Sequence, residues 1–515
     1  MWGQLIAAGT QEEMIEFTSA EAAPSPGDWD GICFKESSVG ATVDTGYLYQ
    51  SGSILSWCKI EYAGPAVTCE LSAPYIANCT ITNNSTSGSG GALYVSGDAV
   101  VIHNTITDNK ATGVLGNGGG VYSIGDTASI INNYVKGNYA FNNGGGLFLS
   151  GDGITKDNII VENSANGSGG GLYIHYGVPT IEDNGIADNA TGGSGGGMYN
   201  HYGESTIQGN SIHGNAAELL GGGIYNAGCS AQIRCNSIVG NRSVDHRGGG
   251  IYYANESMVE SIPLPVHSNN LHSNEGYDIY NATIMNISAE DNCWGVTDTT
   301  AIEENIFDIY DNTTLGPVSY DPIVSQPHTV TDLFVLPSSH HFGSVGPGGI
   351  LSRTFTAYNL STANRMIGTL SITGTHATEF AIQHDNCSGQ IINPLDNCTI
   401  DVVFSPTLAG TKSATLGIPS DNPDVLNVEV VLSGTGTLGI CLIEQIYGYE
   451  SEEVKHLRSF RDKVLCSTPG GQEIIKLYYA YSPLLVEAME ADGAFKQEMR
   501  GLIDMSLLLI RGKVD

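Results

Sequence analysis

Polar and apolar positions repeat every 25 to 28 residues between Cys79 and Tyr280. Each period contains the phrase Asn-x-(Ile/Val/Leu)-x-x-Asn and, after a variable loop, Gly-Gly-Gly-x-Tyr or a close variant. The aromatic positions that close the periods are Tyr94, Tyr122, Phe148, Tyr173, Tyr199, Tyr225, Tyr252 and Tyr280. A fixed period of this size indicates stacked structural repeats.

Two short apolar runs occur in each period, and Asn and Gly bound both of them, as is typical of strands between turns. No period holds 10–12 residues with helical spacing, and the regular leucines of a leucine-rich repeat are absent. Glycine triplets permit tight corners. The pattern therefore predicts a parallel β-solenoid.

The second Asn of the phrase predicts a ladder of stacked amides along the axis, because an amide can hydrogen-bond to the same amide in the next coil. These residues are Asn84, Asn109, Asn138, Asn163, Asn189, Asn215, Asn241 and Asn274. Isoleucines recur in register, and we expect them to fill the interior. They are Ile102, Ile106, Ile181, Ile186, Ile207, Ile212, Ile233 and Ile238.

These signatures, Gly-Gly-(Ala/Gly)-(Ile/Leu)-Tyr with Asn-x-Ile-x-x-Asn, resemble those of right-handed parallel β-helix proteins of the exported bacterial kind. The resemblance covers residues 1–327. That family includes polysaccharide lyases, hydrolases, adhesins and surface proteins, so it implies a fold more than a function. After Tyr280 the repeat decays, and Asp298 can N-cap a short helix. Residues 294–322 are therefore predicted to cap the end of the solenoid.

Residues 328–437 contain about seven alternating strand-like runs, which predict an immunoglobulin-like β-sandwich. Phe342-Gly-Ser-Val, Phe404-Ser-Pro and Leu432-Ser-Gly-Thr-Gly resemble the choice-of-anchor D and ASPM/SPD-2/Hydin-like sandwiches. Those domains serve as spacers or interaction modules, and we expect a spacer here.

Residues 438–515 are predicted to be helical from the spacing of Val454, Leu457 and Val464. Cys441-Leu-Ile, Tyr447-Gly and Val454-Lys-His-Leu-Arg-Ser-Phe-Arg-Asp resemble the CFI-box C-terminal domain. The resemblance implies a sorting or attachment tail, with Cys441 as the attachment residue. The chain departs from the family pattern by a one-residue deletion around Glu444-Gln445 and by a second cysteine, Cys466.

Charge and cysteine content limit which cellular compartment and which binding partners are expected. The net charge of −34 and the scarcity of Lys and Arg before residue 440 exclude nucleic acid as a partner and disfavour anionic polysaccharides. Among eleven cysteines, Cys387 and Cys398 are the best disulfide candidates, with Cys58/Cys69 and Cys229/Cys235 behind them. Pairing would imply an oxidising compartment.

The chain starts in strand-like sequence without a signal peptide, so we expect a truncated N-terminus on a secreted or cell-surface protein. No run of 18 apolar residues occurs, and no transmembrane helix is expected.

Aromatic side chains form the first candidate site. Strand alternation places Ile and Tyr of Gly-Ile-Tyr on opposite faces, so the aromatic residues should line the outside and could stack on sugar rings. The alternative is that they only stabilise the sheet. The candidate ligand-binding residues are Tyr173, Tyr176, Tyr199 and Tyr202.

Carboxylates and histidines form the second set. Asp98, Asp126 and Asp152 fall on three consecutive coils and could hold Ca²⁺, the only cofactor expected, or could be ordinary turn residues. In the next two coils, His175 and His201 stand beside Tyr176 and Tyr202, where they could serve acid/base chemistry or mark a duplicated coil.

The loop 242–247 concentrates the rod's positive charge, and a lyase on this fold would need such a base. Its candidate residues are Arg242, Asp245, His246 and Arg247. No Walker, HExxH or GxSxG motif occurs.

The leading hypothesis is an exported, surface-associated binding or structural rod that contacts a polysaccharide or another cell-envelope component. The alternative is a polysaccharide lyase or glycoside hydrolase that works on the lateral face of the solenoid.

Overall fold

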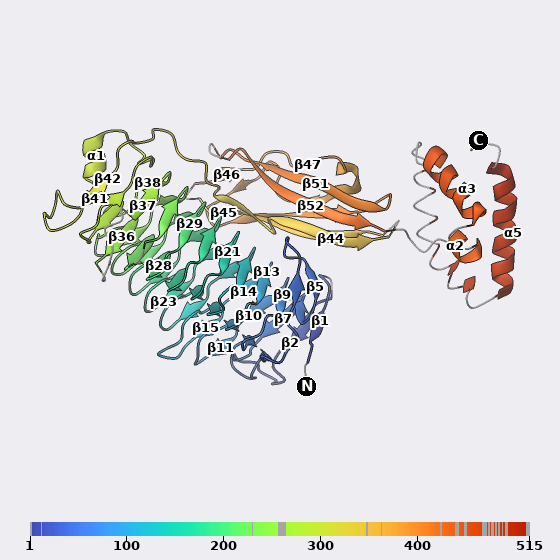
Figure 1. Ribbon diagram of the computed structural model, residues 1–515, viewed down its shortest axis with the longest axis horizontal. Coiled ribbons are helices and arrows are strands. Elements are labelled where there is room, and N and C mark those ends of the chain that lie inside the picture. Colours follow the sequence, from blue (N-terminus) through green and yellow to red (C-terminus); the bar gives the residue numbers. More distant parts are fainter. Residues whose placement is uncertain are drawn as a thin grey trace.

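The computed structural model describes the chain except residues 1–2, 12, 229, 256–263, 347–348, 362, 423–424, 438–441, 448–450, 466–470, 472–473, 475–477, 479–481, 483–484, 487, 490–492 and 511–515. The described part is mainly β: a parallel β-solenoid, a β-sandwich and a few C-terminal helices (Figure 1). The predicted fold class is thus confirmed.

Four parallel sheets run along the solenoid, because each complete coil contributes four short strands. Sheet 1 comprises β1 (Ile6–Ala8), β6 (Ile54–Ser56), β9 (Tyr75–Ala77), β13 (Val100–Ile102), β17 (Ser129–Ile131), β21 (Ile154–Lys156), β25 (Thr180–Glu182), β29 (Thr206–Gln208), β33 (Gln232–Arg234), β37 (Leu264–His267), β40 (Ile287–Ser288) and β42 (Val318–Ser319). Sheet 2 comprises β2 (Ile15–Phe17), β7 (Cys58–Glu61), β10 (Thr80–Thr82), β14 (Thr105–Thr107), β18 (Tyr134–Lys136), β22 (Ile159–Val161), β26 (Gly185–Ala187), β30 (Ser211–His213), β34 (Ser237–Val239) and β38 (Asn270–His272).

Sheet 3 is formed by two-residue strands: β11 (Ser85–Thr86), β15 (Lys110–Ala111), β19 (Tyr139–Ala140), β23 (Ser164–Ala165), β27 (Ala190–Thr191), β31 (Ala216–Ala217) and β35 (Arg242–Ser243). Sheet 4 comprises β3 (Ile32–Phe34), β8 (Val67–Cys69), β12 (Leu93–Val95), β16 (Val121–Ser123), β20 (Leu147–Leu149), β24 (Leu172–His175), β28 (Met198–His201), β32 (Ile224–Ala227), β36 (Ile251–Ala254), β39 (Ile279–Asn281) and β41 (Ile306–Phe307). Each period of the sequence shows two apolar runs, whereas each complete coil has four strands, so the runs predict only half of the strands.

Two asparagine ladders hold the coils together from inside. In the predicted ladder, the amide of each Asn donates to the Oδ1 of its counterpart in the next coil, for example Asn163 to Asn189 at 3.0 Å. The first Asn of the phrase forms a second, parallel ladder, for example Asn184 to Asn210 at 3.0 Å. Buried amides are satisfied by this stacking, which fixes the register between coils.

Glycine at the corners is required by the close approach of neighbouring coils. A Cβ on Gly119 would lie 2.4 Å from the carbonyl oxygen of Gly145 and 2.5 Å from the backbone of Tyr139. No side chain fits in that space, so the glycine triplet is a packing requirement between coils.

The interior is filled by the predicted isoleucines with one exception. Ile106, Ile181 and their counterparts in the later coils lie in the main core, but Ile102 does not. In β13 the neighbouring Val101 faces the core, and Ile102 faces outward into a smaller cluster with Tyr75. The hairpin of β4 (Thr42–Val43) and β5 (Tyr49–Ser51) covers this cluster and makes both faces of β13 apolar.

The far end of the solenoid is closed by a short helix and two strands. Asp298 caps α1 (Thr299–Glu303) by accepting hydrogen bonds from the backbone N–H groups of Thr300 and Ala301. The helix ends before Ile306, which lies in β41, and Tyr310 is exposed.

The sandwich has two four-stranded sheets and a small additional pair. One sheet is β43 (Leu333–Leu336), β45 (Leu351–Asn359), β50 (Asn397–Phe404) and β48 (Phe380–Asp385), preceded by the 3-10 turn η1 (Ala377–Glu379). The other is β44 (Ser339–Val345), β52 (Asn427–Gly436), β51 (Gly410–Pro419) and β47 (Ser371–Thr373), and β46 (Arg365–Met366) pairs with β49 (Ile391–Ile392).

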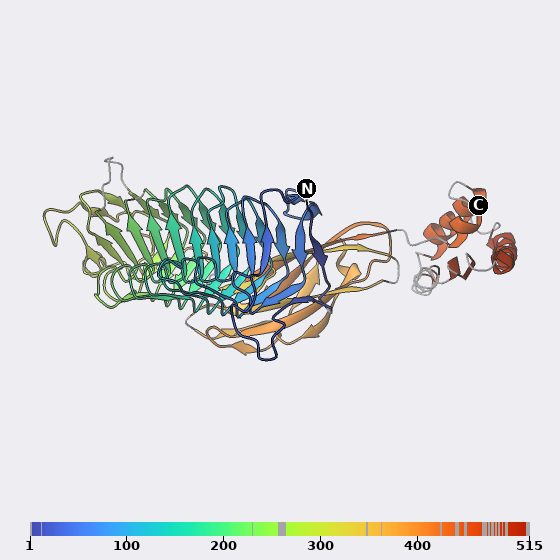
Figure 2. The same ribbon diagram turned by 90° about the horizontal axis from the view of Figure 1, so that it is seen from below.

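The sandwich folds back along the rod and does not project from it (Figures 1 and 2). Phe334 and Leu360 of the sandwich pack against Ile159, Val161 and Ala187 on the outer face of sheet 2. The expected spacer role therefore needs correction, because this domain covers one flank of the solenoid.

The C-terminal segment is helical where it is described: α2 (Leu442–Tyr447), α3 (Glu452–Phe460), the π-helical turn η2 (Arg461–Leu465) and α5 (Gly493–Ile510). Ile446, Val486 and Met489 form a small core there. In the described part of the chain, no helix has the length and apolar character needed to cross a membrane. The domain boundaries 1–327, 328–437 and 438–515 remain a prediction.

Candidate functional site

A column of stacked aromatic rings runs along the outside of sheet 4, as alternation predicts. Consecutive ring centroids lie 4.2 to 5.2 Å apart. The column comprises Tyr94, Tyr122, Phe148, Tyr173, Tyr199, Tyr225, Tyr252, Tyr280 and Phe307. Every ring inside the column has a ring on both faces, so Tyr173 and Tyr199 have no open face for a sugar. Phe307 escaped the sequence analysis because the repeat phrase has decayed there.

A second aromatic group lies where β24 and β28 end. His175 pairs in register with His201, and their rings are 5.6 Å apart. Tyr176 and Tyr202 follow them, and these two rings stack at 5.4 Å. We call these four residues the His–Tyr patch. The hydroxyl of Tyr173 lies 3.3 Å from Nδ1 of His201, which connects the patch to the aromatic column.

Both tyrosines of the patch have left-handed backbone conformations, with φ of 62° at Tyr176 and 56° at Tyr202. Non-glycine residues adopt this region at a cost, and it points the side chain away from the strand direction. Tyr176 is 50% exposed, whereas Tyr202, with the same backbone conformation, is half-buried. The repeated His-Tyr-Gly sequence thus places two tyrosines at a corner of the coil, outside the column.

His175 of the patch differs from a free imidazole. Burial and the neighbouring His201 lower the pKa of His175 below its ordinary value. His175 is therefore neutral at pH 7 and can both donate and accept a hydrogen bond. A neutral imidazole suits uncharged hydroxyl groups better than it suits carboxylates or phosphates.

The aspartate column serves the turns. Oδ1 of Asp98 accepts a hydrogen bond from the backbone N–H of Thr127 at 2.9 Å, and Oδ1 of Asp152 accepts from Val178 at 2.8 Å. The backbone N–H of Asp152 donates to the carbonyl of Asp126 at 2.8 Å. Within the described residues, no group of three His, Cys, Asp or Glu is arranged to hold a metal ion. Asp152 instead anchors the loop that follows Tyr176.

The 242–247 loop precedes β36 in the chain, and β36 is two strands beyond β28 in sheet 4. The loop therefore lies away from the His–Tyr patch. Arg247 donates to Oδ2 of Asp245 at 2.9 Å, and Nδ1 of His246 lies 3.8 Å from Oε1 of Glu275. The hydrogen bond with Asp245 raises the pKa of Arg247. Arg242 belongs to β35 and is exposed. The loop therefore carries acid and base groups but stands apart from the other candidates.

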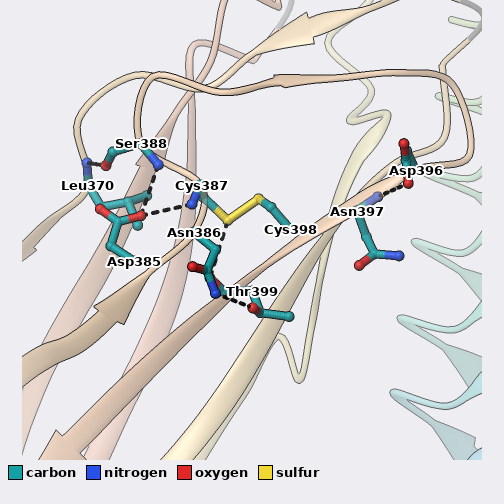
Figure 3. The surroundings of a disulfide bond; sticks show 9 residues. All are labelled: Leu370, Asp385, Asn386, Cys387, Ser388, Asp396, Asn397, Cys398 and Thr399. Atoms are coloured by element: carbon teal, nitrogen blue, oxygen red, sulfur yellow. Dashed lines mark hydrogen bonds between the residues drawn. A yellow bond between two sulfur atoms is a disulfide. The ribbon is translucent and has the colours of Figure 1, made fainter.

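Cys387 and Cys398 form a disulfide with a Cα–Cα distance of 5.3 Å, within the sandwich (Figure 3). The Asp385 carboxylate accepts from the backbone N–H groups of Cys387 and Ser388 beside it. The weaker pairing of Cys58 with Cys69 is not formed, because both thiols are free and lie in different sheets. Cys229, Cys441 and Cys466 lie outside the described residues.

Asp278 is a buried polar residue of the rod that the repeat phrase does not include. Asp278 ends the predicted Asn ladder, since its Oδ1 accepts from both the backbone N–H and the amide of Asn274, at 3.3 and 2.8 Å. Burial raises the pKa of Asp278 to about 7. An acidic residue four positions after the last Asn of the ladder is the signal that could have identified it.

Stacked parallel coils, internal Asn ladders and an external aromatic column define a parallel β-helix protein. A family model described as "Right handed beta helix region" matches residues 27–167 and 119–294, together just over half of the chain. The chain belongs to this family. No curated protein matches it.

Similar solved structures include the secreted serine protease VesC from Vibrio cholerae, 21% identical over 23% of this chain and 24% of that chain, with a TM-score of 0.18. A protein of unknown function from Porphyromonas gingivalis is 12% identical over 23% of this chain and 54% of that one, also with a TM-score of 0.18. The ASH/PapD-like domain of human CEP192 is 12% identical over 23% and 93%, with a TM-score of 0.18. The chain spans about a quarter and about half of the first two proteins, and none of the three carries a functional argument.

Proposed function

We propose that the chain is an exported, surface-associated β-helix protein whose rod binds polysaccharide at the His–Tyr patch. The observation that carries this proposal is the stacked pair formed by the exposed Tyr176 and the half-buried Tyr202. Among the described residues, each of these two tyrosines stacks on no tyrosine or phenylalanine other than its partner, and its remaining ring contacts are with His175 and His201.

The register explains why the outer ring faces stay open. The pairing of β24 with β20 ends at Ile174, and Gly177, the residue after Tyr176, lies against Gly151 of the preceding coil. Extending the pairing of β28 with β32 by one residue places Gly228 opposite Tyr202. Neither glycine has a side chain to cover a ring, so each tyrosine presents one face on which a pyranose could stack.

Hydrogen-bonding groups flank this stacking surface. The imidazoles of His175 and His201 lie 4.4 Å, centroid to centroid, from the rings of Tyr176 and Tyr202 respectively. A sugar stacked on a tyrosine would present its hydroxyls to these nitrogens. Because the rod is strongly acidic, we propose a neutral or amino-sugar polymer rather than a polyuronate.

Export and attachment belong to the same proposal. The C-terminal segment resembles a sorting tail and contains Cys441, and the sandwich, which packs on the rod, would connect the rod to that segment. The Cys387–Cys398 disulfide supports an oxidising compartment.

Replacement of Tyr176 tests the binding site. Tyr176→Ala removes the exposed ring, and Tyr310→Ala serves as the matched control because Tyr310 is 79% exposed at the far end of the rod. Loss of one stacking contact, worth about 1 kcal/mol, should weaken glycan binding by about fivefold to tenfold. We expect wild type and Tyr310→Ala to bind equally on a glycan array. Equal retention of Tyr176→Ala on every glycan that binds the wild type would refute the site.

A second candidate function is polysaccharide cleavage at the 242–247 loop. What favours it is the proximity of Arg247 to the end of the aromatic column, where its charge acts on Tyr252 and Tyr280. Asp245, His246 and Glu275 supply acid and base groups beside it. Release of new reducing or unsaturated ends by the wild type, abolished in Arg247→Ala, would support this alternative.

A further inference from the structure

A cavity of about 140 Å³ lies between the rod and the sandwich. Thr105 and Tyr134 line it from sheet 2 of the rod, and His103 lines it from the corner before β14. Arg353, Thr356 and Tyr358 line it from β45. Tyr134 and Tyr358 stack across the interface at 4.9 Å. The two walls come from segments more than 200 residues apart in the sequence.

Arg353 is the unusual residue of this cavity. Its side chain is only 9% exposed, and its guanidinium carbon lies 4.9 Å from the centre of the Trp57 ring. No described carboxylate lies within ion-pair distance of it, and its buried Nε has no hydrogen-bond partner. Burial lowers the pKa of Arg353 to about 10, which leaves the group charged at pH 7.

A buried, unpaired cation is costly, and proteins usually supply a counter-charge. The chain has a net charge of −34, so acidic residues are abundant, and yet no described carboxylate lies beside Arg353. Arg247 and Arg365 each have an aspartate partner, the latter Asp332 at 2.7 Å. The counter-charge of Arg353 is therefore expected to come from outside the chain.

A second unpaired group lies in the same cavity. Nε2 of His103 is buried and has no partner. Burial and the charge of Arg353 lower the pKa of His103 to about 3, so the ring is neutral and can donate one hydrogen bond. Thr105 and Tyr134, which carry hydroxyl groups, also line the cavity on the rod side.

We propose that this cavity binds a small oxyanion, phosphate or sulfate, between the rod and the sandwich. The guanidinium of Arg353 would pair with the oxyanion through its planar N–H groups, and His103 and the hydroxyls would donate to the remaining oxygens. Because residues of both the rod and the sandwich would bind the anion, the bound anion would stabilise the contact between the sandwich and the flank of the rod.

Titration calorimetry and thermal melting of the full chain test this proposal with phosphate, sulfate and chloride at equal ionic strength. Phosphate or sulfate should bind saturably and raise the melting temperature, whereas chloride should not. Arg353→Met should weaken the binding by about tenfold to a hundredfold, the loss expected for a charged hydrogen-bond pair. Arg365→Met is the control, and it should retain the wild-type affinity for the oxyanion.

Two results would overturn the proposal: no saturable binding of either oxyanion to the wild type, or an unchanged affinity in Arg353→Met. Because the substitution could disturb folding, crystals of the wild-type chain soaked in tungstate give a second measurement. The anomalous peak should lie beside Arg353, and peaks found only elsewhere would contradict the assignment.

Discussion

The substitution Asn163→Ala removes one rung from the middle of an Asn ladder. The Asn163 amide donates to Oδ1 of Asn189 at 3.0 Å and to the carbonyl of Val135 at 2.9 Å. Its Oδ1 accepts from the backbone N–H and the amide of Asn138, both at 3.0 Å. All four hydrogen bonds are buried. At about 1 kcal/mol each, their loss should cost about 4 kcal/mol of local stability.

Hydrogen exchange measured by mass spectrometry reports this local free energy of opening. The method is appropriate for a solenoid because neighbouring coils can open without global unfolding. Exchange should accelerate in the coils on either side of Asn163 and stay unchanged at both ends of the rod. Asn166→Ala, at an exposed position of the same coil, should change the stability by less than about 0.5 kcal/mol. A loss below about 1 kcal/mol in Asn163→Ala, or an equal effect of both substitutions, would refute the role assigned to the ladder.

Two further predictions concern the ladder's end and the flank. Because the folded pKa of Asp278 is about 7 and its unfolded value is near 3.8, its stabilising contribution is fully present below about pH 4 and is lost as the pH rises through 7. Asp278→Asn should remove this dependence and melt higher than the wild type at pH 8; parallel melting curves from pH 4 to 8 would contradict the idea. Gly185→Leu should displace the sandwich, because even a Cβ at Gly185 would lie 2.1 Å from Cδ1 of Leu360. Small-angle scattering should then show a more extended particle, while Gly88→Leu, at an exposed turn, should leave the profile unchanged.

The repeat phrase carried most of the information about the rod. Its Asn and Tyr positions predict the ladder and the aromatic column because each side chain there contacts the same residue type one period away. The aspartates were ambiguous for a related reason, since a column of Asp can serve a metal ion or a turn. The structure adds the hydrogen bonds that Asp98 and Asp152 accept from turns of the next coil, which the sequence pattern does not contain.

Contacts between distant segments could not be predicted from the periodicity. Ile102 was assigned to the core because alternation cannot separate two apolar faces, and a hairpin 50 residues earlier makes the outer face apolar. The three consecutive apolar residues Ile159–Val161 leave no solvent-facing position in that strand. They therefore indicate that another part of the protein covers this flank of the rod. The partner of that flank, and the cavity around Arg353, depend on how the sandwich docks.

The central proposal is that the rod binds polysaccharide at the His–Tyr patch rather than cleaving it. The most direct measurement incubates the purified chain with a panel of neutral, amino-sugar and acidic polysaccharides and records both retention and new reducing or unsaturated ends. We expect retention on a neutral or amino-sugar polymer, reduced in Tyr176→Ala, with no new chain ends. Cleavage that disappears in Arg247→Ala, without any Tyr176-dependent retention, would contradict this account.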